Sequence, residues 1–171
     1  DAKPGDIYQL GESRLMVGDS TVQEDVAKLM NGEVAEMCLT DPPYIADYKG
    51  GIRHGSPVTT KGPKRSRRYL ETEEIPDNFT KLWMANIANT ANGNFSIIVY
   101  ESWKNVRAIW NEMEKHFTVK NMLVWHIPQK NDGYAAKHKF FNKYDIAMVG
   151  GRGAVEYNDE DEPDGLHETY R

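Results

Sequence analysis

The sequence predicts an α/β domain in which a largely parallel sheet is flanked by helices. Apolar residues at helical spacing alternate with short apolar runs typical of strands, and this order indicates parallel strands joined by crossover helices. A stiff Asp-Pro-Pro-Tyr turn at residues 41–44 directly follows one of these runs. A length of 171 residues with 39% hydrophobic content fits one globular unit. We therefore place the domain at residues 1–155 and an acidic tail or connector at residues 156–171.

The N-terminal part is expected to form a hairpin, a helix and a strand. Two short apolar-rich runs, Ile7 to Leu10 and Arg14 to Val17, are separated by a turn-like Gly-Glu-Ser and predict the hairpin. A capping box at Thr21–Glu24 and the helical stripe beyond it predict a helix that ends near residues 31–32. The apolar run from Val34 to Leu39 predicts a strand that stops at the two prolines.

The second half of the chain is expected to continue the alternation. The elements predicted there are, in order, a helix with its stripe at Phe79–Ile87 that ends at Asn92-Gly93-Asn94, a strand at Phe95–Tyr100, a helix capped by Ser102, and strands at Val119–Ile127 and Asp145–Val149. The tryptophans are expected in or beside the core.

Charge is distributed unevenly, although the net charge is −5. Residues 45–75 are rich in Gly, Pro, Ser and basic residues without periodicity, which is typical of a functional loop or of disorder, and we interpret them as a mobile basic loop. From Glu156 to Glu168 acidic residues occur with no Lys or Arg among them. The local electrostatic field of each segment therefore matters more than the net charge of the chain.

Several classes of site are disfavoured by the composition. A single cysteine, Cys38, excludes an internal disulfide and argues against a cysteine-rich zinc site, and its apolar surroundings predict a buried small residue. The histidines share no ligand-like spacing with carboxylates, so we expect no metal. No run approaches the roughly 18 apolar residues of a membrane span, and the start is unlike a signal peptide, so we expect no membrane partner and a cytoplasmic protein.

The turn at residues 41–44 contains the groups that one reaction needs. An exocyclic amino group is a poor nucleophile, because its lone pair is delocalised into the base ring. The Asp41 carboxylate and the Pro42 carbonyl can each accept one N–H bond and so aim that lone pair at an electrophilic methyl group. The prolines stiffen the turn, and the ring of Tyr44 offers a face on which a base taken out of the duplex can stack.

Residues 39–44, Leu-Thr-Asp-Pro-Pro-Tyr, resemble the catalytic motif of the amino-group DNA methyltransferases, which act on adenine N6 or cytosine N4. Residues 18–20, Gly-Asp-Ser, lie about 20 residues earlier and are similar to the opening of the permuted subgroup, in which this motif precedes the cofactor motif. Prophage- and plasmid-type modification methylases have a similar start. The resemblance covers about residues 5–150 and is diffuse after residue 93.

The resemblance implies a Rossmann-like S-adenosylmethionine-dependent methyltransferase fold. It also implies methyl transfer from S-adenosylmethionine to N6 of an adenine flipped out of double-stranded DNA. It gives catalytic roles to Asp41, Pro42 and Tyr44, contact with the target base to Pro43 and Tyr44, and contact with the cofactor to Asp19 and Asp41. The alternative for Asp19 is an ordinary turn residue before the helix.

A basic cluster after the tetrad is predicted to contact DNA phosphates. It consists of Lys61, Lys64, Arg65, Arg67 and Arg68. Its position beside the catalytic motif is where a duplex would have to lie. The alternative is a solvated loop without a partner. Phosphate contacts would position the duplex and would not read its sequence.

One feature of the family is missing from the sequence. The Phe-x-Gly-x-Gly-type loop that holds the methionine part of the cofactor in the resembling subgroup has no counterpart, and the glycine cluster at residues 150–153 lacks its aromatic residue and the helix after it. The first residue is Asp rather than Met. We therefore expect an incomplete catalytic half, with a missing C-terminal half or a second chain carrying the cofactor loop.

Alternative functions stay open on the sequence alone. Within the same chemistry they are cytosine-N4 transfer and an amino-methyltransferase directed at glutamine or RNA, and Asp at position 41 favours adenine. Outside it, the missing glycine loop allows a non-catalytic DNA-binding remnant. The two classes differ in whether the chain, once completed, transfers a methyl group.

Overall fold

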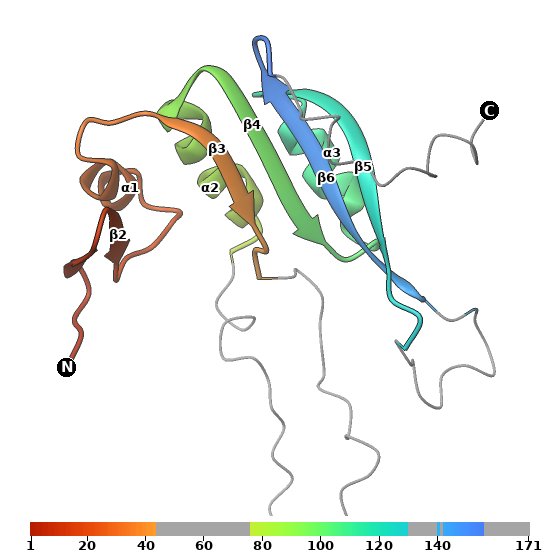
Figure 1. Cartoon of the computed structure of the whole chain (residues 1–171), viewed down its shortest axis with the longest axis horizontal. Coiled ribbons are helices and arrows are strands. Elements are labelled where there is room, and N and C mark those ends of the chain that lie inside the picture. Colours follow the sequence, from red (N-terminus) through yellow and green to blue (C-terminus); the bar gives the residue numbers. More distant parts are fainter. Residues whose placement is uncertain (44–75, 130–139, 141, 156–171) are drawn as a thin grey trace, which may run out of the picture.

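The computed structural model describes residues 1–43, 76–129, 140 and 142–155, and Figure 1 shows their arrangement. In chain order the elements of this part are β1 (Ile7–Leu10), β2 (Ser13–Met16), α1 (Gln23–Met30), β3 (Ala35–Thr40), α2 (Phe79–Thr90), β4 (Ala91–Glu101), α3 (Val106–Met113), β5 (Thr118–His126) and β6 (Tyr144–Arg152). They form a two-stranded sheet, β1-β2, and a four-stranded sheet in the order β3-β4-β6-β5.

The N-terminal hairpin is confirmed, and it docks on α1. Strands β1 and β2 pair antiparallel across a turn in which Gly11 has a φ of 65°, a conformation that glycine adopts without strain. The Arg14 guanidinium donates to the Lys28 carbonyl at 3.0 Å, and the Lys28 ammonium donates to the Gly5 carbonyl at 2.6 Å. These reciprocal bonds hold the exposed hairpin against the last turn of α1.

The start of α1 differs from the predicted capping box. Val22 occupies the N-cap position, where its apolar side chain cannot form a cap bond, and Thr21 forms hydrogen bonds with the preceding turn instead of with the helix. The backbone N–H and the hydroxyl of Thr21 both donate to Asp19 Oδ1, at 2.8 and 2.7 Å. The helix ends as expected at Asn31, which is left-handed with a φ of 52°.

The larger sheet is mixed, so the prediction of a largely parallel sheet is wrong. Strands β3 and β4 pair parallel, whereas β6 pairs antiparallel with both β4 and β5, so that β3, β4 and β5 share one direction. The physical reason is the connection. Helices α2 and α3 precede β4 and β5 and return the chain to the start of the sheet, whereas the described residues between β5 and β6 contain no helix and β6 runs back beside β5.

The expected turns at both ends of β4 are also corrected. Helix α2 passes directly into the strand at Ala91, and residues 92–94 lie inside β4. The strand is irregular there, because two residues along β3 are matched by five residues along β4. At the other end, Asn105 rather than Ser102 is the N-cap residue of α3, and the Ser102 carbonyl accepts the Asn105 N–H at 2.9 Å in the preceding turn.

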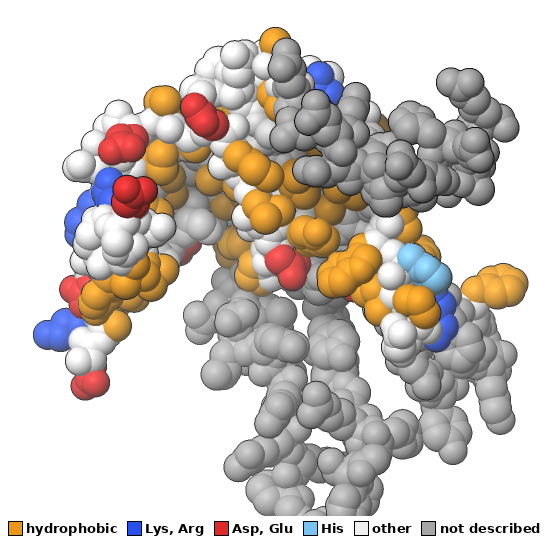
Figure 2. All heavy atoms as spheres, in the orientation of Figure 1, with side chains coloured by type: hydrophobic (Ala, Val, Ile, Leu, Met, Phe, Trp, Pro, Cys, Tyr) orange, Lys and Arg blue, Asp and Glu red, His pale blue; other side chains and the backbone are white. Residues whose placement is uncertain are grey.

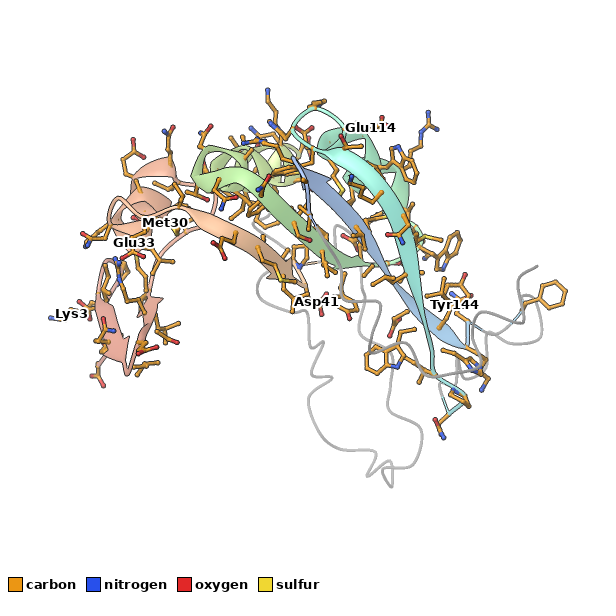
Figure 3. The ribbon with its side chains drawn as sticks, turned by 45° about the horizontal axis from the view of Figure 1, so that its top comes forward. Lys3, Met30, Glu33, Asp41, Glu114 and Tyr144 are labelled. Carbon is orange, nitrogen blue, oxygen red and sulfur yellow. The ribbon has the colours of Figure 1, made fainter. Side chains whose placement is uncertain are left out.

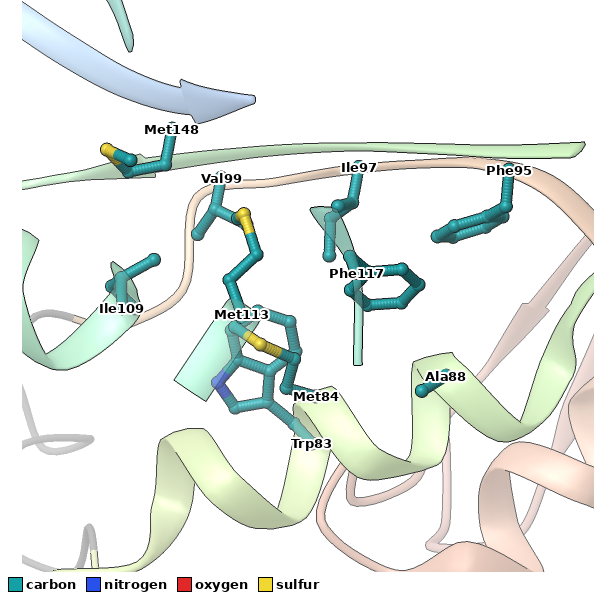
Figure 4. Close-up of a cluster of buried hydrophobic side chains, with 10 residues drawn as sticks. All are labelled: Trp83, Met84, Ala88, Phe95, Ile97, Val99, Ile109, Met113, Phe117 and Met148. Atoms are coloured by element: carbon teal, nitrogen blue, oxygen red, sulfur yellow. The ribbon is translucent and has the colours of Figure 1, made fainter. Parts of the chain in front are cut away.

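One face of the sheet holds the hydrophobic core. Figure 4 shows Phe95, Ile97 and Val99 of β4 and Met148 of β6 facing side chains of α2 and α3. The helices contribute Trp83, Met84 and Ala88 of α2 and Ile109 and Met113 of α3, with Phe117 just beyond. The rings of Phe95 and Phe117 stack with centroids 5.3 Å apart.

The opposite face carries exposed apolar side chains. The register places Leu39 beside Ile98, and Leu123 beside Ala147, on the face away from α2 and α3. Leu39 is 64% exposed, Leu123 46% and Trp125 62%. Figure 2 looks onto this face and shows hydrophobic side chains gathered over the strands. Of the tryptophans, Trp83 lies in the core as predicted, whereas Trp103, Trp110 and Trp125 are exposed.

Candidate active site

Asp41 lies at the carboxyl end of the two parallel strands. Thr40, the last residue of β3, pairs with Val99, so Asp41 comes level with the end of β4. Pro42 is buried and Pro43 half-buried, while Asp41 is exposed. The predicted position of the motif at a strand end is therefore confirmed, and Figure 3 shows Asp41 at the tip of β3. In α/β sheets, ligands bind beyond these carboxyl ends.

Glu101, the last residue of β4, is a second acid at the same edge and was missed in the sequence. It is only 3% exposed, and its Oε1 accepts the Ser102 N–H at 2.6 Å and the Asn105 side-chain amide at 3.3 Å. Burial raises the pKa of Glu101 to about 7, the two hydrogen bonds lower it, and the charge of Asp41 raises it. The available signal was an acid placed directly after an apolar strand.

The edge continues across the sheet to β5. Trp125 and His126, the last residues of β5, pair with Asp145 and Tyr144 at the start of β6. On the other side of β6, Glu101 pairs with Ile146, whose partner on β5 is Val124, the residue before Trp125. The exposed ring of Trp125 therefore belongs to the same edge of the sheet as the two acids.

Asp19 occupies the turn before α1, where it organises the backbone. Its Oδ1 accepts both bonds from Thr21, and its own N–H donates to Asp25 Oδ2 at 2.8 Å. The neighbouring Ser20 carbonyl accepts the Asn86 side-chain amide of α2 at 2.9 Å. These bonds account for Asp19 as a turn residue, and its cofactor contact stays a prediction.

The glycine cluster after residue 149 is explained by close packing. Gly150 and Gly151 are residues of β6, and a Cβ on Gly150 would lie 2.6 Å from Met113 Sδ. A Cβ on Gly151 would lie 2.9 Å from the Phe95 carbonyl oxygen. The strand thus uses these glycines to bring β6 close to its neighbours. No feature of this cluster corresponds to a cofactor loop.

Cys38 faces the core side of the sheet and is half-buried beside the cluster. Burial raises the pKa of its thiol to about 11, so the thiolate is scarce at neutral pH. The expectation of a buried small residue is confirmed only in part, because Cys38 packs against the core but is half-buried. Across the described ranges, no three His, Cys, Asp or Glu side chains are grouped to hold a metal, and no helix there has the length and apolarity to cross a membrane.

Some predicted residues lie outside the described part of the chain. They are Tyr44, the basic loop at 45–75 with Lys61, Lys64, Arg65, Arg67 and Arg68, and the acidic tail at 156–171. Their assigned roles stay predictions.

Comparison with known proteins identifies the fold. No family model matches the chain, and no curated protein does. Two crystal structures match 85% of it: M1.HpyAVI, with a TM-score of 0.54 and 14% identity, and the M1.HpyAVI–SAM complex, with a TM-score of 0.50 and 16% identity. The fold is shared with M1.HpyAVI. The match spans 61% and 58% of the two M1.HpyAVI chains, so about two fifths of M1.HpyAVI has no counterpart here.

Proposed function

We propose that this chain is the catalytic part of a DNA methyltransferase that moves a methyl group from S-adenosylmethionine to N6 of a flipped-out adenine. The observation that carries the proposal is the Asp41-Pro42 turn at the carboxyl edge of β3, in a fold shared with a protein crystallised with SAM. The motif resemblance of residues 39–44 supplies the reaction, and the fold supports the cofactor.

The geometry of the turn suits an amino group as nucleophile. Asp41 is exposed, and among the described residues its carboxylate accepts no hydrogen bond, which leaves it available to a substrate N–H. Pro42 is buried, so the backbone that presents its carbonyl is fixed. Two acceptors beside each other localise the nitrogen lone pair before the reaction.

Asp41 and Asp19 are the described residues proposed to contact S-adenosylmethionine, which supplies the electrophilic methyl group. The exposed carboxylate of Asp41 at an open strand end fits the reacting end of this cofactor. Asp19 fits less directly, because Oδ1 already accepts two bonds from Thr21. The rest of the cofactor site therefore has to come from elsewhere.

We propose that a further polypeptide unit, either a continuation of the chain or a second chain, completes that site along β3. Strand β3 is an edge of the described sheet, and its outward side chains Met37 and Leu39 are 52% and 64% exposed. Parallel strands are normally buried on both faces and paired on both sides. About two fifths of M1.HpyAVI has no counterpart in this chain, and the proposed unit would correspond to that part.

The proposed partner is double-stranded DNA, held by phosphate contacts from Lys61, Lys64, Arg65, Arg67 and Arg68. Tyr44 would stack on the flipped base, with Pro43 beside it. Cytosine-N4 transfer is the alternative within the same chemistry. A non-catalytic DNA-binding remnant is the alternative from another class, and its motive is the missing Phe-x-Gly-x-Gly-type loop.

The test is single-turnover transfer of labelled methyl to duplex DNA by the protein completed with the further unit proposed above. Asp41→Ala should lower the rate by about 10² to 10³, because a preorganised acceptor acts mainly in the transition state. Asp6→Ala, which removes a half-buried carboxylate directly before β1 and outside the candidate site, is the control and should keep the parent rate.

Nucleoside analysis of the product decides among the alternatives. Label on N6 of adenine supports the proposal, and label on cytosine overturns the choice of base. An Asp41→Ala protein within tenfold of the parent rate would sink the mechanism. A completed protein that binds DNA but transfers no methyl group would establish the remnant.

A further inference from the structure

We propose that Glu101 is a positioning residue of the candidate active site, whose carboxylate charge acts through Asp41 to favour the positive charge that develops on the attacking nitrogen. The inference rests on the proposed function and deepens it. It assigns a role to a second acid at the edge where Asp41 lies, one that the sequence motif does not contain.

The placement of Glu101 follows from strand register. Thr40 pairs with Val99 in the parallel ladder, so the chain reaches Asp41 and Glu101 at the ends of adjacent strands. On its other side Glu101 pairs with Ile146 of β6. The two acids therefore share one edge of the sheet, and the negative charge of Asp41 contributes to raising the pKa of Glu101.

The turn after β4 holds the carboxyl of Glu101 in place. Its Oε1 accepts the Ser102 N–H at 2.6 Å and the Asn105 amide at 3.3 Å, and the residue is almost fully buried. Both donors are neutral. A glutamine could accept the same two bonds, so the turn requires an oxygen acceptor at this place but does not require a charge.

A comparison with Glu112 shows what is unusual about Glu101. Glu112 is also buried, but it forms an ion pair with Lys115, and its Oε1 lies 3.5 Å from His116 Nε2. Within the described residues, Glu101 has no cation in ion-pair contact, and the charged group that acts on it is another acid. Buried carboxylates are ordinarily paired, because removing their charge from water is unfavourable. Such an unpaired acid is typical of a site with a function.

The groups facing Glu101 set the range in which it changes charge. Asp41 lies at the end of the neighbouring strand β3 and acts on Glu101 through its charge, the neutral Ser102 and Asn105 donate hydrogen bonds from the turn before α3, and the apolar Ile146 pairs with it from β6. Burial is the largest influence and raises the pKa of Glu101 to about 7. The residue is therefore neutral in mildly acidic solution and ionised in mildly basic solution.

The effect on methyl transfer follows from charge. A bond forms between the amino nitrogen and the methyl carbon while the carbon–sulfur bond breaks with its electron pair going to sulfur. The nitrogen then carries positive charge until it releases a proton to solvent. A second negative charge behind Asp41 stabilises that positive nitrogen. The transfer rate should therefore rise as Glu101 ionises, that is, as pH increases through about 7.

The experiment compares pH profiles of single-turnover methyl transfer in the completed protein. The parent rate should rise about threefold to tenfold between roughly pH 6 and pH 8, and Glu101→Gln should remove this rise without changing KM for DNA. Glu112→Gln, which alters a buried but paired acid, should keep the rise. An unchanged profile in Glu101→Gln overturns the inference.

A second measurement does not depend on methyl transfer. The carboxyl carbon of Glu101 is followed by NMR in the 171-residue chain, where Asp41→Asn should lower the pKa of Glu101 and the control Asp6→Asn should not. An unaffected Glu101 titration overturns the inference while methylation by the parent still supports the proposed function. A parent protein without methyl transfer overturns both.

Discussion

The two faces of the large sheet differ in how far other parts of the described chain cover them. The face toward α2 and α3 is closed by side chains such as Phe95, Ile97 and Met148 that have no exposed surface, whereas the opposite face presents Leu39 and Trp125 with most of their surface accessible. The difference indicates that α2 and α3 provide the local core, while the open face is apolar for another purpose. Substitutions on the covered face should therefore lower the free energy of unfolding, whereas substitutions on the open face should weaken association with the proposed further unit.

The largest effect is expected on the covered face. Phe95→Ala should lower the free energy of unfolding by about 3 to 5 kcal/mol, because a fully buried ring that stacks on Phe117 would be replaced by a cavity. Urea unfolding followed by circular dichroism measures the change. Leu123→Ala on the open face is the comparison and should lose much less. Equal losses would show that the open face is as important for folding as the core.

A smaller effect is expected from adding volume to the same face. Gly150→Ala should destabilise by about 1 to 3 kcal/mol, since the new Cβ would meet Met113 Sδ at 2.6 Å and Ile97 Cγ2 at 3.2 Å. Gly93→Ala is the control, because no atom lies within 4 Å of its added Cβ. Thermal unfolding of the two variants side by side is the measurement. A Gly150→Ala protein as stable as the parent would mean that Met113 moves aside without loss.

The smallest effect on stability is expected on the open face. Leu39→Asn should change the free energy of unfolding of the isolated chain by no more than about 0.5 kcal/mol, because this side chain contributes little to the described core. It should instead weaken the association with the further unit proposed along β3. Leu123→Asn, on the open face of β5 at the other edge, should leave that association intact. Analytical ultracentrifugation of the co-expressed pair checks this, and equal association in both variants argues against β3 as the docking edge.

The sequence predicts the part of the fold that depends on local patterns. The hairpin, the strand before the tetrad and the common direction of β3, β4 and β5 follow from periodicity and from alternation with helices. The position of β6 does not follow, because its insertion between β4 and β5 depends on long-range pairing. The cap of α1 was mispredicted for a related reason: Thr21 has an alternative acceptor in Asp19, and sequence spacing does not decide between them.

The candidate site shows the same division. Asp41 and Pro42 were identified because their spacing is a motif, and the structure places them at the strand end that the two prolines predicted. Glu101 belongs to no motif, and only the parallel register of β3 and β4 brings it beside Asp41. Its burial and the absence of a cation among its described neighbours are properties of the folded chain.

The place of β6 has a consequence for how the chain is made. In the described sheet β5 is hydrogen-bonded to β6 alone, and β6 is the later of the two in the sequence. During synthesis β3 and β4 can pair as soon as α2 has folded, but β5 has no strand to join until residues 144–152 have left the ribosome. A nascent chain stalled before Tyr144 would therefore expose Phe117 and the rest of the half-built core, and such a chain is a natural target for holdase chaperones.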